Sequence, residues 1–176
     1  MGVAQGIDQF FKLAHKLQDR TDLGFVFVGR GTEMERFREN DTYNSLDNIL
    51  FFDQVDPDEI PSLYDQCHIG MLSLDARHKT HNIPGKFLSY ISSGLPVLAS
   101  VNPGNDLIDL IKDSNTGKVI FDANLSNLSK EAELLVELLD TGDLKQNCKN
   151  LREELFQPSR AVSQIIGEVK SIKNKS

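Results

Sequence analysis

The chain has 176 residues, of which 39% are hydrophobic and 26% are charged, a composition typical of one globular domain with its own core. Its formal net charge of −7 argues against a general nucleic-acid or anionic-membrane surface, so an anionic ligand would need a local cationic pocket. Cys67 and Cys148 lack the spacing of a metal site and are typical of a reducing compartment. Because neither a signal-peptide pattern nor an apolar run of roughly 18 residues is present, the sequence predicts a cytoplasmic protein.

Short apolar runs alternate with helical patterns along the chain. The first helical pattern has apolar side chains at positions 7, 10, 11, 14 and 17. The runs that follow are continuously apolar rather than alternating, which indicates strands buried on both faces. Strand–helix alternation in turn predicts right-handed units and a parallel sheet. The predicted strands are residues 25–28, 49–52, 69–72, 96–99 and 118–121.

Helix signals complete the pattern. Residues 56–59 combine a capping aspartate, a proline at the first helical position and acids near the positive helix end. Ile60, Leu63 and Tyr64 are the predicted buried face of the helix that follows. The predicted fold class is α/β, a doubly wound and mostly parallel Rossmann-like sheet with extra C-terminal helices. Those extra helices are predicted at 125–139, 144–155 and 161–172.

One departure from a doubly wound domain is evident at the start of the sequence. Such a domain opens with a strand, whereas here the first helical pattern begins at Ile7. The strand lacking from the pattern is the central one in the usual order, so two inner strand edges are expected to lack a neighbour. Three occupants stay open: residues outside this sequence, a segment swapped from a second copy, or closure of the gap.

Residues 82–104 are the most informative about function. They combine a loop carrying Lys86, a short helix, a turn at Gly94, a buried-type strand and a second loop with Pro-Gly. This order places a cation and several backbone N–H groups at the carboxyl end of a sheet, which suits a diphosphate. A lysine at a helix start is unfavourable for the helix dipole unless an anion is present. The glycines in residues 2–6 and 29–31 either approach phosphate oxygens through their N–H groups or form plain turns.

This segment resembles the donor-binding signature of two-domain, retaining glycosyltransferases of family 4, which have the GT-B fold. The positions that fall on the pattern are Pro84, Lys86, Tyr90, Gly94, Pro96 and Val97. The order of the other features is similar to that family as well, from the glycine turn near Gly6 through Val-Gly-Arg-Gly at 28–31. The resemblance implies a single nucleotide-sugar-binding domain, residues 1–176, with the N-terminal acceptor domain and the first strand outside the sequence.

The resemblance also implies roles for individual residues. Lys86 would stabilise the negative charge that develops on the leaving nucleoside diphosphate, and it is the residue given a catalytic role. The loop at Val55 resembles a family turn whose backbone contacts the nucleobase. The donor-binding residues implied in all are Gln5, Gly6, Gly29, Arg30, Gly31, Val55, His81, Pro84, Gly85 and Ser89.

Three of these positions differ from the family pattern. Ser89 and His81 stand where the family has two glutamates, and a serine hydroxyl holds a ribose diol less well than a carboxylate does. Gln5 stands where many members carry a second phosphate-binding lysine, a charge that Arg30 would have to supply. The side chains considered as replacements for the carboxylates are Asp75, Asp106 and Asp109.

The function implied is the donor-binding half of a retaining glycosyltransferase that moves a hexose or amino sugar to a growing polysaccharide or lipid-linked acceptor. The motif around Lys86 points to bacterial capsule or lipopolysaccharide assembly. No metal and no cofactor besides the nucleotide sugar are implied, and the sequence has no metal-ligand spacing. Expected partners are the nucleotide sugar, the acceptor domain and the saccharide or lipid-linked acceptor, but no nucleic acid; a homo-oligomer stays open. The full-length protein would be cytoplasmic and peripheral at the inner membrane face, and the isolated chain inactive.

Two other functions stay open. The missing carboxylates favour a stand-alone nucleotide-binding or regulatory module that binds its ligand without a further domain. A sugar-nucleotide epimerase of the same fold would need acids and a histidine placed for proton chemistry, and no such set is evident. A dinucleotide oxidoreductase is disfavoured, because no Gly-x-Gly-x-x-Gly follows a first strand.

Overall fold

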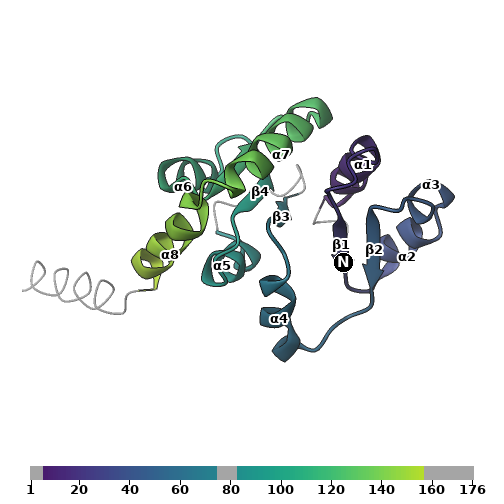
Figure 1. Ribbon diagram of the computed structural model, residues 1–176, viewed down its shortest axis with the longest axis horizontal. Helices are drawn as coiled ribbons and strands as arrows, with labels where there is room; N and C mark the ends of the chain where they lie inside the picture. Colours follow the sequence, from purple (N-terminus) through teal and green to yellow (C-terminus); the bar gives the residue numbers. More distant parts are fainter. Residues whose placement is uncertain (1–5, 75–82, 157–176) are drawn as a thin grey trace, which may run out of the picture.

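The computed structural model describes residues 6–74 and 83–156, in which two parallel sheets share one layer of helices (Figure 1). In the smaller sheet β1 (Phe25–Val28) pairs with β2 (Ile49–Phe52), in register from Phe25 and Ile49 onward. In the larger sheet β4 (Val97–Ser100) lies between β3 (Gly70–Ser73) and β5 (Gly117–Ile120). The five predicted strands are therefore confirmed, three of them shifted by one residue.

One core cluster lies under both sheets and joins them. It is covered by α1 (Asp8–Lys16), α2 (Thr32–Arg38), α3 (Asp41–Asn44) and α7 (Leu125–Leu139). At its aromatic end the Phe11 ring of α1 stacks on Phe27 of β1 and on Phe37 of α2, with 3.9 Å between ring centroids in both pairs. Leu98 and Ile120 of the larger sheet belong to the same cluster. We call this side of the molecule the shared face.

A second core cluster covers the opposite face of the larger sheet. It is formed by α5 (Gly85–Ser92), α6 (Leu107–Ser114) and α8 (Asp143–Leu155), with Phe87, Ile91 and Ile111 fully buried. In β4, Val97 and Ala99 belong to this cluster whereas Leu98 belongs to the first. The prediction of a strand buried on both faces is thus confirmed for β4, all four residues of which are buried.

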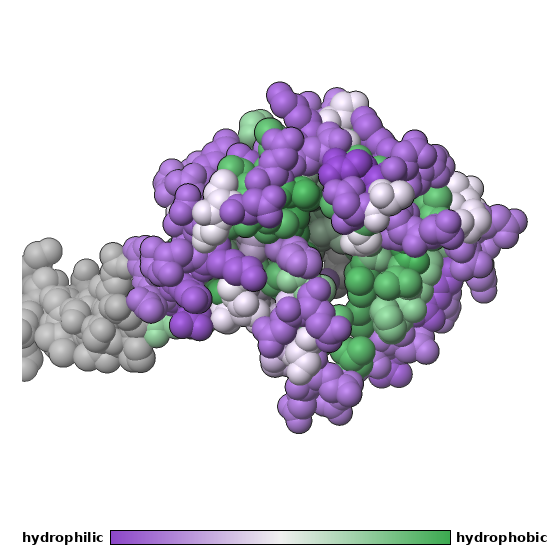
Figure 2. All heavy atoms as spheres, in the orientation of Figure 1, coloured by the Kyte–Doolittle hydropathy of each residue, from purple (hydrophilic) through white to green (hydrophobic). Residues whose placement is uncertain are grey.

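The opposite face of the smaller sheet has no such cover among the described residues. Leu50 and Phe52 of β2 are 53% and 48% exposed, and Val26 and Val28 of β1 are half-buried. In the space-filling view hydrophobic residues gather beside an opening near the centre of the molecule (Figure 2). The prediction of burial on both faces is wrong for β2, because the helices around this sheet all pack on the shared face.

The predicted helix signals have mixed outcomes. Asp56 does form a capping box with Glu59, on a 3-10 turn, η2 (Pro57–Glu59), that leads into α4 (Ile60–Asp65). The predicted buried face of α4 is wrong, because Ile60, Leu63 and Tyr64 are only half-buried on this six-residue helix. The predicted helices at 125–139 and 144–155 are confirmed as α7 and α8, while 161–172 lies outside the described residues. Helices α2 and α3 were not predicted.

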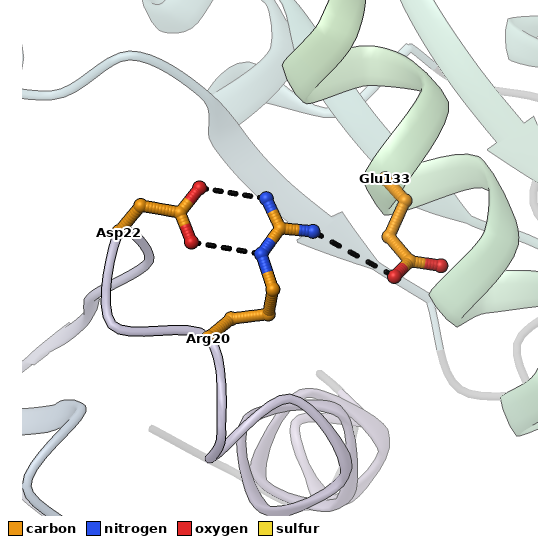
Figure 3. Close-up of polar contacts among 3 residues, drawn as sticks. All are labelled: Arg20, Asp22 and Glu133. Atoms are coloured by element: carbon orange, nitrogen blue, oxygen red, sulfur yellow. Dashed lines mark hydrogen bonds and ion pairs between the residues drawn. The ribbon is translucent and has the colours of Figure 1, made fainter.

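Polar contacts join the two sheets along the seam between α1 and α7. After α1, Arg20 donates two hydrogen bonds to Asp22, at 2.8 and 2.6 Å, and reaches Glu133 of α7 at 3.7 Å (Figure 3). The hydrogen bond from Arg20 lowers the pKa of Asp22 to about 2. Lys16 Nζ donates to Ser126 Oγ of α7 at 3.5 Å. The smaller sheet is therefore tied to the larger one through helices rather than through strand pairing.

Candidate functional site

The first predicted site residues lie where β1 ends. Gly29 and Gly31 have φ angles of 139° and 120°, which side chains disfavour, and they flank the exposed Arg30. Gly31 directly precedes the first residue of α2, so the backbone turns from strand to helix within three residues. Such a turn lets backbone N–H groups approach an anion closely.

Gly6 lies at the same end of the smaller sheet. It precedes α1 with a φ angle of 52°, and its carbonyl accepts a hydrogen bond from Gln9 Nε2 at 3.3 Å. Asp8, the first residue of α1, pairs with Arg36 of α2 at 2.9 Å. Arg36 lies in the last turn of α2, so this ion pair joins the start of α1 to the end of α2. The start of α1 lies near the carboxyl ends of β1 and β2 because the Phe11 ring stacks on Phe27 and Phe51.

The loop after β2 holds the next predicted residue. Val55 is half-buried there, just before the capping Asp56. An ion pair of 2.7 Å between Arg38 of α2 and Asp53 anchors the loop, and the Arg38 guanidinium lies 5.7 Å from the centre of the Phe51 ring. The loop containing Val55 is therefore held at the carboxyl end of the smaller sheet, as a nucleobase contact would require.

Lys86 lies in the first turn of α5. Pro84 precedes the helix in an extended conformation, and as the N-cap residue it makes no side-chain hydrogen bond to α5. The Lys86 side chain is exposed, yet desolvation by the atoms around it lowers the pKa of its amine below the ordinary value. Among residues 6–74 and 83–156, a Cβ atom at Gly85 would meet no atom within 4 Å. The start of α5 thus combines a cation with the N–H groups of a helix end.

Ser89 lies one turn further along α5. Its side chain is exposed, and its hydroxyl donates to the Gly85 carbonyl at 3.1 Å, a bond within the helix. The hydroxyl proton is therefore used inside α5, and only the oxygen lone pairs are left to accept a bond from a ligand. A carboxylate at this position would offer two charged acceptor oxygens instead.

Tyr90 contributes to this region in a way that the sequence did not indicate. Its ring packs on the backbone of Gly70, where an added Cβ would lie 2.5–2.8 Å from the ring atoms. Its hydroxyl donates to the Met71 carbonyl at 3.2 Å, and its ring meets Tyr64 of α4 edge-on at 5.2 Å. Tyr90 therefore fixes α5, and with it Lys86, against β3. A glycine inside a predicted strand was the signal for this close approach.

The loop after β4 completes the carboxyl edge of the larger sheet. Asn105 is buried, and its side chain accepts a hydrogen bond from the Leu107 N–H at 2.9 Å. Asp106 and Asp109 are exposed at the start of α6. Carboxylates are thus present at this edge, one helix away from α5.

Several predicted residues fall outside the described part of the chain, namely Gln5, Asp75 and His81. The structure brings Gly6 to the edge that carries Gly29, Arg30, Gly31 and Val55, and it places Pro84, Gly85, Lys86 and Ser89 together at the start of α5. Their roles in binding stay predictions.

Neither metal chemistry nor thiol chemistry is indicated by the described residues. Within residues 6–74 and 83–156 no three His, Cys, Asp or Glu side chains gather into a metal-binding group. Burial raises the pKa of the Cys148 thiol to about 12 and also raises that of Cys67, so both thiols are poor nucleophiles at neutral pH. No helix in these ranges is both long and apolar enough to span a bilayer.

Comparison with known proteins agrees with this architecture. Residues 1–141 match the model of the family described as "Glycosyl transferases group 1". Among solved structures the chain is similar to WaaG, a glycosyltransferase involved in lipopolysaccharide biosynthesis, with a TM-score of 0.67 and 17% sequence identity. That alignment covers 88% of this chain and 40% of the WaaG chain, so the present chain spans well under half of that protein. No match was found among curated protein sequences.

Proposed function

Since the chain belongs to the glycosyl transferases group 1 family, we propose that it is the nucleotide-sugar donor-binding half of a retaining glycosyltransferase. The donor is a nucleoside diphosphate sugar bound at the carboxyl ends of the strands, between the 29–31 turn and the start of α5. The acceptor site belongs to a further domain, in keeping with a chain that spans 40% of WaaG. On this proposal the chain alone is inactive as a transferase.

The observation that carries the proposal is the position of Lys86. A lysine in the first turn of a helix is repelled by the positive end of the helix dipole. Lys86 is in addition partly desolvated, which lowers the pKa of its amine. An anion bound between Lys86 and the first N–H groups of α5 would favour the charged amine and offset the helix dipole. A diphosphate fits because its negatively charged oxygens can bind the lysine amine and the helix N–H groups at the same time.

The chemistry assigned to this arrangement is stabilisation of the leaving group. During transfer the bond between the anomeric carbon and the diphosphate oxygen breaks and its electron pair stays on the diphosphate. The oxygen of an acceptor hydroxyl bonds to that carbon, and the hydroxyl proton passes to the leaving diphosphate. On this proposal Lys86 and the α5 N–H groups stabilise that growing charge. The glycine turn at 29–31 and Gly6 approach the same diphosphate through their backbone, Arg30 adds a cation, and the loop at Val55 contacts the nucleobase.

For the biological setting we propose bacterial polysaccharide or lipopolysaccharide synthesis. WaaG, which shares the fold, is described as acting in lipopolysaccharide biosynthesis. The sugar would be a hexose or amino sugar, the acceptor a saccharide or a lipid-linked saccharide, and the site cytoplasmic at the inner membrane face. The reaction assigned here uses no metal and no cofactor besides its donor.

A non-catalytic nucleotide-binding or regulatory module is the second candidate, and one observation favours it. Ser89 uses its hydroxyl proton inside α5, so the ribose contact that a glutamate makes in the family is weakened here. Such a module would still bind a nucleoside diphosphate. It would differ from the first candidate in showing no transfer even when joined to an acceptor domain.

Calorimetric titration of the chain with UDP and then GDP tests the donor site. With Lys86→Ala we expect the affinity for the preferred diphosphate to fall about 10- to 150-fold, as for the loss of a hydrogen bond to a charged group. The matched control is Lys130→Ala, which removes an exposed lysine from α7 and should leave the affinity unchanged. Equal affinities of the Lys86→Ala and unchanged proteins, or no binding of either diphosphate, would contradict the proposal.

A further inference from the structure

The connection from β2 to β3 joins the predicted nucleobase loop to the larger sheet. It begins with the loop at Val55, continues through η2 and α4, and reaches β3 at Gly70. The Asp56 side chain accepts a hydrogen bond from the N–H of Asp58, and the Glu59 side chain accepts one from the N–H of Asp56. This capping box ties the loop and the start of α4 together by hydrogen bonds.

Helix α4 belongs to neither core. Within the described residues neither core cluster contains a residue of α4, and Ile60, Leu63 and Tyr64 are only half-buried. The Tyr64 ring meets the Tyr90 ring of α5 edge-on, with 5.2 Å between the ring centroids, an arrangement that aromatic pairs prefer. In Figure 1, α4 lies next to α5 and apart from the helices of the shared face. The position of α4 relative to the larger sheet therefore depends on the contact between these two rings.

Tyr90 in turn is held by β3. Its ring packs on the backbone of Gly70, and its hydroxyl donates to the Met71 carbonyl. Burial raises the pKa of Tyr90 far above the ordinary value, and burial also raises the pKa of Tyr64. Both hydroxyls therefore stay neutral at physiological pH, so the contact between the rings depends on packing rather than on charge.

Lys86 lies on the same face of α5 as Tyr90. The two residues are four apart in the sequence, which places them one turn from each other along one side of the helix. That side is the one on which Tyr90 contacts β3 and α4. The contact between Tyr64 and Tyr90 thus lies one helical turn from the proposed phosphate-binding lysine.

The other end of the connection is fixed to the smaller sheet. Arg38 of α2 pairs with Asp53 at 2.7 Å, two residues before Val55. An ion pair therefore anchors the loop beside the smaller sheet, and a ring contact anchors α4 beside the larger one. A nucleoside diphosphate bound as proposed would span both sheets, with its base at Val55 and its phosphates at Lys86.

From this arrangement we propose that Tyr64 is a positioning residue, which sets the distance between the nucleobase loop and Lys86. The role assigned to Tyr64 is indirect, because its ring holds α4 against α5 and thereby holds Val55 where a base can bind. A ligand with both a base and a diphosphate gains from this spacing, whereas a diphosphate without a base does not. The inference rests on the proposed function and adds a coupling between the two parts of the donor site.

Titration calorimetry with pyrophosphate and with the preferred of UDP and GDP tests the inference. Tyr64→Leu removes the ring but keeps an apolar side chain. We expect it to weaken nucleoside diphosphate binding about five- to tenfold, within the range for the loss of an aromatic pair. Pyrophosphate has no base, so its affinity should stay within about twofold of that of the unchanged chain. Tyr64→Phe keeps the ring and should bind both ligands as the unchanged chain does.

Tyr43→Leu is the matched control. Tyr43 is also half-buried and also meets a ring edge-on, that of Phe37 at 5.5 Å, but it packs against the first core cluster under the smaller sheet. Its substitution should lower the urea midpoint of unfolding without changing either affinity. The control therefore separates a loss of stability from a loss of positioning.

Three results would overturn the inference while the proposed function stands. Equal nucleoside diphosphate affinities of Tyr64→Leu and the unchanged chain would limit the ring contact to stability. Equal losses for both ligands would mean that Tyr64 acts on Lys86 alone rather than on its distance from the base loop. Failure of pyrophosphate to bind the unchanged chain would show that Lys86 holds no diphosphate independently of the base. If the unchanged chain binds neither UDP nor GDP, the proposed function itself is refuted, and the inference with it.

Discussion

The two sheets of this molecule are built from parallel strands of four residues each but are covered differently. The larger sheet has helices on both faces, and its own core is mostly aliphatic. Among the described residues the smaller sheet has helices on the shared face only, and the rings packed there include Phe11, Phe27, Phe37, Tyr43 and Phe51. The larger sheet therefore has a core cluster that contains no residue of the smaller sheet.

This difference in helix cover shows which contacts stabilise each of the two sheets. A two-stranded sheet is marginal by itself and needs packing against helices. The smaller sheet obtains that packing from α1, and α1 in turn packs against α7, which belongs to the larger half. The predicted ligand loops after β1 and β2 thus belong to the sheet that helices cover on one face. The start of α5 belongs to the sheet that helices cover on both faces.

The largest effect is expected from Phe11→Ala. The Phe11 ring is fully buried and stacks on two other rings, so its removal should cost about 3–5 kcal/mol of unfolding free energy. Phe52→Ala, in the same sheet on its uncovered face, should change that free energy by about 0.5 kcal/mol or less. Urea unfolding of both variants measures the contrast, and similar losses for the two would refute one-sided cover.

A second substitution tests the larger sheet. A Cβ atom at Gly117 would overlap the backbone of Val97 in β4, lying 2.7 Å from its nitrogen and even closer to its carbonyl oxygen. Because backbone cannot move aside as a flexible side chain can, Gly117→Ala should cost about 3 kcal/mol. Gly24→Ala, placed before β1 with no atom within 4 Å of the new Cβ, is the matched control. Chemical denaturation that finds the two equally stable would contradict the β4–β5 packing.

Tyr90→Phe should have a smaller effect. It removes one hydrogen bond and leaves the Met71 carbonyl without that donor, for an expected loss of about 1 kcal/mol. If the hydroxyl also positions α5, Tyr90→Phe should lower the affinity for the diphosphate. Lys86→Ala should lower that affinity further when it is added to Tyr90→Phe. Titration calorimetry on the single and double variants separates positioning from stability; an unchanged affinity would limit Tyr90 to a structural role.

The sequence was sufficient for the strands and most helices because their signals are local. Continuous apolar runs predicted β1 to β5 to within one residue. The burial of side chains was predicted less well, since it depends on which helices pack over each face of a sheet. Leu50 and Phe52 have the composition of a buried strand yet have no helix over them among the described residues.

In the candidate site, too, local features were predicted from the sequence and packing contacts were not. The positions of Lys86 at a helix start and of the 29–31 turn at a strand end follow from local pattern, and both are confirmed as geometry. The contact of Tyr90 with Gly70 joins residues 20 apart in number, and the Ser89 hydroxyl bond depends on a rotamer. Neither can be deduced from spacing, because both are decided by how α5 packs on β3.

The smallest effect is expected at the seam between the two halves, where Arg20 joins Asp22 and Glu133. The pKa of Asp22 is about 2 in the folded chain against an ordinary value near 4, so the unfolded chain binds more protons between these two pH values. The stabilisation is therefore complete above pH 4 and lost as the pH falls through 2. Asp22→Asn should flatten this part of the stability curve, measured by urea midpoints at pH 5, 3 and 2.

Because both groups are exposed, the gain is small, and a double-mutant cycle with Arg20→Gln is needed to isolate it. The double variant should lose no more than the single ones, since either substitution already removes the pair. Additive losses would show that Arg20 acts instead through Glu133, across the seam. That result would make the contact of Arg20 with α7, rather than its pair with Asp22 within the turn, the place where charge holds the two sheets together.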